Sequence, residues 1–209
     1  MALKEVKARF DDVLSSGSVS VAATSRCAVS LATLPAVARY HPESCVVRFY
    51  SHADLNTPEA TETGYLGGLA LAGPAGLWDS GLGKGLSLDQ IVLVGQRDLD
   101  PFETELIDMH NIPHIKPGES LAGRLKDAVA GRAVHVHLDC DVLNPGIVPT
   151  DYVHEGGLTL EELRACCDVI AAGPFVGIEI AEFQNSWEPG GEPVSPAALL
   201  DALSPLLSR

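Results

Sequence analysis

The chain has 209 residues, of which 46% are hydrophobic, and its formal net charge is −14. This length and composition predict a globular protein with a sizeable core and exclude a disordered one. The acidity argues against binding to nucleic-acid backbones or anionic membrane surfaces, and the sequence has no run of about 18 apolar residues that would predict a membrane span.

The five cysteines are odd in number and include no C-x-x-C pair. Such usage is typical of a reducing compartment and argues against a structural zinc knuckle. Residues 1–10 mix charged and apolar positions, as expected of an amphipathic helix and not of a signal peptide. We therefore expect a cytoplasmic protein with neither a membrane nor a nucleic acid as its partner.

Helical and strand patterns alternate along the chain. In chain order, we expect a helix over residues 3–15, a strand over 19–24, a helix over 26–40, a strand over 45–50, a long connection over 55–90 with one short helix near 67–72, a strand over 91–95, a helix over 101–110, a strand over 112–115, a helix over 119–130, a strand over 133–140, a helix over 159–172, a strand over 175–183 and a helix over 195–208. The strands are continuous apolar runs, which predicts a mostly parallel sheet with helices on both sides. Residues 1–209 are expected to form a single α/β domain.

The strand over residues 133–140 runs into two carboxylates, Asp139 and Asp141. Because side chains two residues apart in a strand share a side, both point the same way. Two anions this close repel unless a cation lies between them, and oxygen ligands favour a hard divalent metal. His52 and Asp54 repeat this spacing after an earlier strand. The alternative is that the acids are turn or cap residues and that His52 bonds to a backbone carbonyl.

Several polar residues lie at or just after the expected strand ends, where α/β sheets bind ligands. They are Cys27, His52, Asp54, Asp100, Asp139, Asp141 and Glu182. This clustering predicts a functional site at one edge of the sheet. His154, in a later loop, is interpreted as a surface residue, with a role as proton shuttle as the alternative.

Five segments carry a resemblance to a known family, in the family's order and spacing. They are residues 52–58 (HADLNTP), 63–68 (TGYLGG), 94–101 (VGQRDLDP), 139–146 with 155–159 (DCDVLNPG and EGGLT), and 177–183 (GIEIAEF). Through them the chain resembles the arginase, agmatinase and formimidoylglutamase family, the ureohydrolases, over roughly residues 15–205. The resemblance implies a three-layer α/β/α fold around a mostly parallel sheet, and homo-oligomers that are trimers or hexamers. It also implies a two-manganese site whose bridging hydroxide attacks a guanidinium or amidine carbon and releases urea or a relative.

Carried over by position, the resemblance implies a role for each matching residue. The implied metal ligands are His52, Asp54, Asp139, Asp141 and Cys27. The implied substrate-binding residues are Asn56 and Thr63, for a substrate carboxylate, and Asp100 and Glu103, near a substrate amino group. Glu182 is the implied catalytic acid that orients the substrate's guanidinium, because a buried carboxylate pairs well with a planar cation.

Four residues depart from the family's pattern. Tyr50 stands where the family has the Asp that bridges both metals, and a phenol with a pKa of about 10 is a poor replacement. Cys27 replaces a histidine ligand, and Arg26 replaces an acid beside it. Gly67 stands where arginases have the histidine that shuttles protons, which disfavours arginine as the substrate. The sequence therefore predicts one or two manganese ions, with Tyr50 acting against the second.

Two functions are consistent with this sequence. The first is a metal-dependent hydrolase of a C–N bond in a guanidino or amidino compound. The second is a degenerate relative that keeps the fold and at most one metal and has a structural or regulatory role. Family members usually carry a first strand and helix before the point where this chain begins, so we expect the sheet to lack those two elements.

Overall fold

Six parallel strands form one sheet in the computed structural model, which describes residues 2–208. The strands are β1 (Ser20–Ala23), β2 (Cys45–Phe49), β3 (Ile91–Val94), β4 (His114–Ile115), β5 (Val134–Asp139) and β6 (Phe175–Ala181). Their order is β1-β6-β5-β2-β3-β4, and each neighbouring pair is parallel. The central strands β2, β3 and β5 are buried along their whole length, as a sheet covered on both faces requires.

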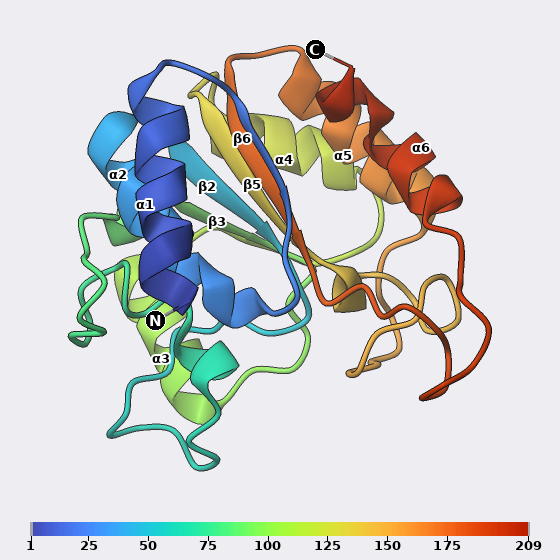
Figure 1. Ribbon diagram of the computed structural model, residues 1–209, viewed down its shortest axis with the longest axis horizontal. Coiled ribbons are helices and arrows are strands. Elements are labelled where there is room, and N and C mark those ends of the chain that lie inside the picture. The colour runs from blue at the N-terminus through green and yellow to red at the C-terminus, as the bar shows by residue number, and fades with distance from the viewer. Residues whose placement is uncertain (1, 209) are drawn as a thin grey trace.

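Across residues 2–208, six α-helices cover the two faces of the sheet (Figure 1). They are α1 (Ala2–Ser15), α2 (Ser30–Tyr40), α3 (Pro101–His110), α4 (Leu121–Val129), α5 (Leu160–Ala171) and α6 (Ala197–Leu207). Helices α4, α5 and α6 share one core with Val47 and Phe49 of β2. Helices α2 and α3 share another core with Val46 on the opposite face of that strand, and α1 packs on α2. The predicted three-layer α/β/α class is confirmed.

Some predicted boundaries are wrong for local reasons. The helix expected over residues 26–40 begins as a 3-10 turn, Cys27–Val29, and becomes α-helical only from Ser30. The helix expected from residue 119 begins at Leu121, because Ser120 has a φ of 56°, in the left-handed region that interrupts a right-handed helix. The short helix expected near residues 67–72 is the 3-10 turn Leu66–Leu69.

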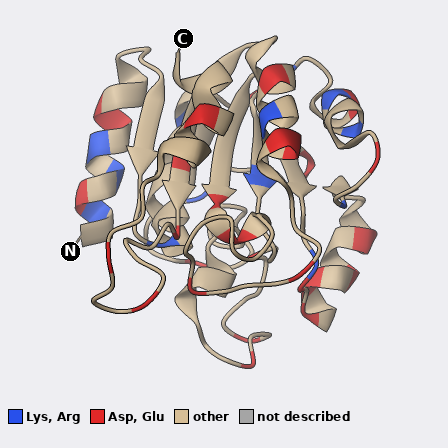
Figure 2. Cartoon of the chain, turned by 90° about the vertical axis from the view of Figure 1, so that its right-hand side faces the viewer, with Lys and Arg blue, Asp and Glu red and all other residues tan. Residues whose placement is uncertain are grey.

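The loops that follow the carboxyl ends of the strands gather at one edge of the sheet. Figure 2 shows more acidic than basic positions in these loops, whereas α1 carries both kinds along its length. None of the helices within residues 2–208 is long and apolar enough to cross a membrane. The acidic positions at this edge favour a cationic ligand over an anionic one.

Candidate active site

The first part of the site is built where the neighbouring strands β2 and β5 end. Their register pairs Phe49 with Leu138, so the residues that follow each strand meet. The backbone N–H of Ser51 donates to Oδ1 of Asp141 at 2.9 Å, and the Ser51 hydroxyl donates to Oδ2 at 2.6 Å. The backbone N–H of Asp141 donates to Oδ1 of Asp139 at 3.0 Å. Both aspartates are thus fixed by the turn that ends β5.

Asp139 carries an oxygen with no protein partner. Its Oδ2 atom is buried and accepts no hydrogen bond from the described residues. Ligand atoms of Cys27, Asp139 and Glu182 all lie within 4.8 Å of one another, and all three residues are buried. Burial, followed by the charge of Asp141, raises the pKa of Asp139 well above its usual range. An orphaned, buried anion of this kind fits a cation beside it.

The neighbourhood of Asp54 is different because a cation is already there. The guanidinium of Arg48, which is fully buried on β2, forms an ion pair with Oδ2 of Asp54. Burial still raises the pKa of Asp54 to about 6, although Arg48 acts in the opposite direction. The family resemblance implies that one of its two metal ions lies beside Asp54. The residues there do not fit such an ion, because Arg48 already occupies that place.

Tyr50 lies next to Arg48 and contacts Cys27. Its hydroxyl donates to Sγ of Cys27 at 3.4 Å, and the Arg48 guanidinium carbon lies 5.2 Å from its ring centre. Burial is the main reason that the pKa values of the Tyr50 phenol and the Cys27 thiol are raised far above their ordinary values. A neutral phenol does not replace the missing bridging carboxylate.

Glu182 lies beside Cys27 but already holds a guanidinium from the protein itself. Its Oε1 atom accepts the Cys27 N–H at 2.9 Å, and its Oε2 atom accepts from Arg26 at 2.8 Å. Arg26 also pairs with Asp151 at the surface. Glu182 and Asp54 both have positive φ values, 63° and 55°, which are uncommon for non-glycine residues.

A pocket of about 280 Å³ lies next to these groups. Its lining residues are Tyr50, His52, Asp54, Asn56, Thr61, Thr63, Tyr65, Gly68, Asp98, Asp100, Glu103 and Tyr152. The set includes each residue that the resemblance implies for substrate binding. The amide of Asn56 donates to Oδ2 of Asp100 at 2.6 Å, which joins the two predicted ends of the substrate site.

Three residues of the site have roles that the sequence did not predict. In the sequence, Arg48 is a single charged residue in an apolar strand. The structure shows that it is fully buried and that it neutralises Asp54 in an ion pair. Asp98 was part of a family segment but had no predicted role, and it lies against His52. Tyr152, in a loop without regular structure, stacks edge-on against His52 with ring centres 5.7 Å apart. Its spacing along the chain gave no signal of this contact.

The pocket acid Glu103 makes the stability of the fold depend on pH. Burial raises its pKa to about 7, although backbone N–H groups of Leu55 and Asp100 donate to it at 2.9 and 3.1 Å. Because the folded pKa exceeds the unfolded value of 4.5, the folded state binds the proton more tightly. The stability from this group is complete below pH 4.5 and is lost as the pH rises through 7.

We therefore expect the free energy of unfolding to fall between pH 5 and pH 8, with Glu103 contributing roughly 3 kcal/mol of the change. Urea denaturation of the wild type and of Glu103→Gln at both pH values measures this contribution. Glu105→Gln, at an exposed position on the same helix, is the matched control. A Glu103→Gln variant whose pH dependence equals that of the wild type would contradict the assignment.

Comparison with known proteins identifies the class that this fold and site define. A sequence model described as the Arginase family matches residues 1–200. The N(omega)-hydroxy-L-arginine amidinohydrolase of Streptomyces lavendulae is 42% identical over 203 residues, which are 97% of this chain and 74% of that protein. The arginase of Glaciozyma antarctica is 28% identical, over 88% of this chain and 59% of its own length. The chain belongs to the arginase family.

Solved structures show the same fold. An arginase from Bacillus subtilis superposes with a TM-score of 0.89 at 19% identity, over 99% of this chain and 77% of the other. The arginase of Bacillus caldovelox gives 0.86 at 24% identity, over 99% and 74%. The chain thus spans about three quarters of these structures and less than two thirds of the arginase of Glaciozyma antarctica.

Proposed function

We propose that the protein hydrolyses a C–N bond of a guanidino group, and that its substrate is an amino acid whose guanidino group is N-hydroxylated. The observation that carries the proposal is the orphaned, buried oxygen of Asp139 beside Cys27 and Glu182, at the strand edge that also forms the pocket. The relative from Streptomyces lavendulae, which covers nearly the whole chain, is named for N(omega)-hydroxy-L-arginine and supports the substrate class.

The pocket offers complementary groups for both ends of an amino acid. Asn56 and Thr63 supply an amide and a hydroxyl that can bind a carboxylate, while Asp100 and Glu103 supply acceptors for an ammonium group. Glu182 supplies a buried carboxylate for the guanidino group once Arg26 leaves it. The side chain of the substrate would therefore point toward the Asp139 group.

One divalent ion is proposed beside Asp139, with Cys27 as its nearest candidate ligand, while Glu182 of the same group is left to bind the guanidino group. His52 and Asp141 remain predicted ligands from the family resemblance. Manganese is the ion that the resemblance implies, and a bound divalent ion of this kind lowers the pKa of water toward neutrality. A second ion is not proposed, because Arg48 neutralises Asp54 and Tyr50 replaces the bridging acid.

An N-hydroxylated guanidino group suits a site with weaker activation of water. The electron-withdrawing hydroxyl makes the carbon of the guanidino group more electron-poor, so that carbon is easier to attack. In the hydrolysis, a water oxygen bonds to the guanidino carbon, the bond from that carbon to the side-chain nitrogen breaks, and the amine leaves with a proton. The products are an amino acid with a terminal amine and N-hydroxyurea.

A panel of guanidino compounds tests the proposal. The purified protein, with and without added Mn²⁺, is incubated with N(omega)-hydroxy-L-arginine, L-arginine, agmatine and guanidinobutyrate, and the urea-type product and the amine are both measured. We expect metal-dependent release of N-hydroxyurea from the first compound at a rate well above that of the others. A protein that turns over none of them with any divalent metal would contradict the proposal.

The second candidate, a structural or regulatory relative without activity, has one observation in its favour. The ion pair of Arg48 with Asp54 neutralises this side of the site without a metal, and Tyr50 and Cys27 are hydrogen-bonded to each other beside it. It predicts a stable protein that binds the amino acid and leaves it intact. Binding without product in the same panel, at every metal tested, would favour this candidate.

A further inference from the structure

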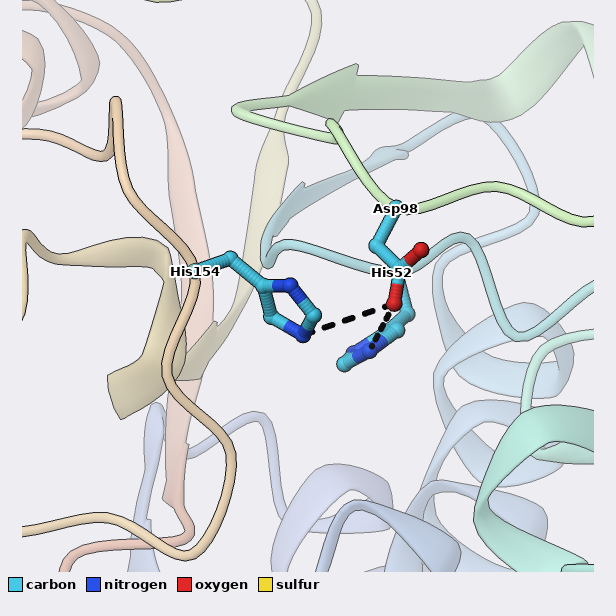
Figure 3. Close-up of side chains that lie close together, drawn as sticks. All are labelled: His52, Asp98 and His154. Atoms are coloured by element: carbon cyan, nitrogen blue, oxygen red, sulfur yellow. Dashed lines mark ion pairs between the residues drawn. The ribbon is translucent and has the colours of Figure 1, made fainter.

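A second group of side chains of the types that ligate metals lies outside the Asp139 group, and two of its members line the pocket. It consists of His52, Asp98 and His154, which come from three different loops (Figure 3). The Nε2 atom of His52 is 3.3 Å from Oδ2 of Asp98, and the Nε2 atom of His154 is 3.4 Å from the same oxygen. The side chains are 22%, 55% and 32% exposed, so ions in solution can reach them.

These separations match the spacing of ligands around one small ion. Zinc binds imidazole nitrogen and carboxylate oxygen at about 2.0–2.2 Å in tetrahedral geometry, which places neighbouring ligand atoms about 3.3–3.5 Å apart. The ligand atoms of all three residues lie within 4.8 Å of one another. Figure 3 shows both imidazoles turned toward the same Asp98 oxygen. Two imidazoles and one carboxylate are also a ligand set that divalent transition metals prefer.

The surroundings of His52 leave its outer nitrogen free to bind metal. Nδ1 lies 3.1 Å from Oδ2 of Asp141 and 3.0 Å from the Ser51 hydroxyl. That hydroxyl already donates to Asp141, so both neighbours of Nδ1 can accept its proton. The Nε2 atom of His52 faces away from these contacts and toward Asp98. This carboxylate–histidine arrangement is the one that orients histidine ligands in metalloproteins.

The loop that carries His154 is held in position by Arg97, the neighbour of Asp98. The Arg97 guanidinium donates to the backbone oxygens of His154 at 2.8 Å and of Asp141 at 2.7 Å. It also donates to the oxygens of Glu155 at 3.1 Å and of Gly95 at 3.0 Å. One side chain therefore ties the loops that carry His154 and Asp98 together, which fixes the distance between two of the three ligands.

We propose that His52, Asp98 and His154 form a separate binding site for one nitrogen-preferring divalent ion of the zinc type, with the fourth position open to water or to a ligand in the pocket. The site uses the outer nitrogen of His52 and no atom of Asp139, Cys27 or Glu182. His52 is also a predicted ligand of the inner ion, but Asp98 and His154 belong to the outer group alone, so these two residues test the outer site separately. An ion bound here links three loops across the pocket mouth.

Cobalt(II) titration of the metal-free protein tests the site, because tetrahedral Co²⁺ absorbs strongly in the visible range and Zn²⁺ displaces it. His154→Ala and Asp98→Asn each remove one ligand from a different loop. We expect both variants to bind Co²⁺ at least tenfold more weakly than the wild type and to lose the visible band. Losses of this size are typical when a side chain that supports a metal site is removed. His110→Ala and Asp127→Asn, at exposed positions on α3 and α4, are the matched controls and keep wild-type binding.

Asp139→Asn separates this site from the proposed inner ion. This variant is expected to keep the tetrahedral Co²⁺ band and to lose the inner ion. His154→Ala is expected to lose the band and to keep the inner ion. Binding that is unchanged within twofold in both His154→Ala and Asp98→Asn would overturn the outer site. Loss of the band in Asp139→Asn, with the band retained in His154→Ala, would do the same and would assign the ion to the inner group.

Discussion

Asp139→Asn is expected to lower kcat/KM for the hydroxylated substrate by about a thousandfold or more, because a metal ion that activates water stabilises the transition state by several kcal/mol. Asp139 is the acid with an orphaned buried oxygen, and it lies within reach of Cys27 and Glu182. The amide keeps the shape of the carboxylate but removes the negative charge that would hold the cation. The hydrogen bond that Oδ1 accepts from the Asp141 N–H can be retained.

The measurement is steady-state kinetics together with the metal content after dialysis. We expect Asp139→Asn to fold with a far-UV spectrum like that of the wild type and to lose both activity and the inner ion. Asp127→Asn, an exposed acid on α4, should change neither. Activity within tenfold of the wild type in Asp139→Asn would show that the reaction does not rely on a cation at this residue.

Arg48→Met is expected to destabilise the metal-free protein by about 3–5 kcal/mol, because it leaves the charge of Asp54 buried without a partner. Arg48 is fully buried and Asp54 is 1% exposed, so solvent does not screen the pair. Methionine fills a similar volume and removes only the cationic head. The loss should be smaller when a divalent ion is added, since the freed carboxylate can then bind it.

Urea denaturation with EDTA, and again with Mn²⁺, measures this prediction. The double variant Arg48→Met/Asp54→Asn should recover part of the stability, because it removes both charges together. Lys7→Met, which breaks the partly exposed Lys7–Asp11 pair at 2.7 Å on α1, is the control and should cost at most about 1 kcal/mol. A loss in Arg48→Met no larger than in Lys7→Met would contradict the role given to Arg48.

Much of the fold follows from local signals in the sequence. The apolar runs at residues 91–95 and 133–140 have the length and composition of strands buried on both faces, and the structure forms β3 and β5 there. The start of α5 was equally clear, since Thr159 and Glu162 exchange the two hydrogen bonds of a capping box at 3.1 and 2.9 Å. Periodicity and caps act within a few residues, so one sequence is sufficient to detect them.

The candidate site was predictable only in part, because its geometry depends on contacts between distant segments. The strand ends located Asp139 and Asp141, since all parallel strands deliver their carboxyl ends to one edge. The ion pair of Arg48 with Asp54, and that of Arg26 with Glu182, depend on side-chain directions that spacing does not determine. His154 was expected at the surface, yet the loop that Arg97 holds brings it to Asp98 and His52.

The most direct test of the central claim is a side-by-side measurement of kcat/KM for N(omega)-hydroxy-L-arginine and L-arginine with the Mn²⁺-loaded protein, with N-hydroxyurea and urea quantified as separate products. We predict release of N-hydroxyurea together with an equal amount of ornithine, and a kcat/KM at least about tenfold higher than for arginine, which requires a difference of about 1.4 kcal/mol in transition-state stabilisation. Equal or faster release of urea from arginine, or no N-hydroxyurea at all, would contradict the account.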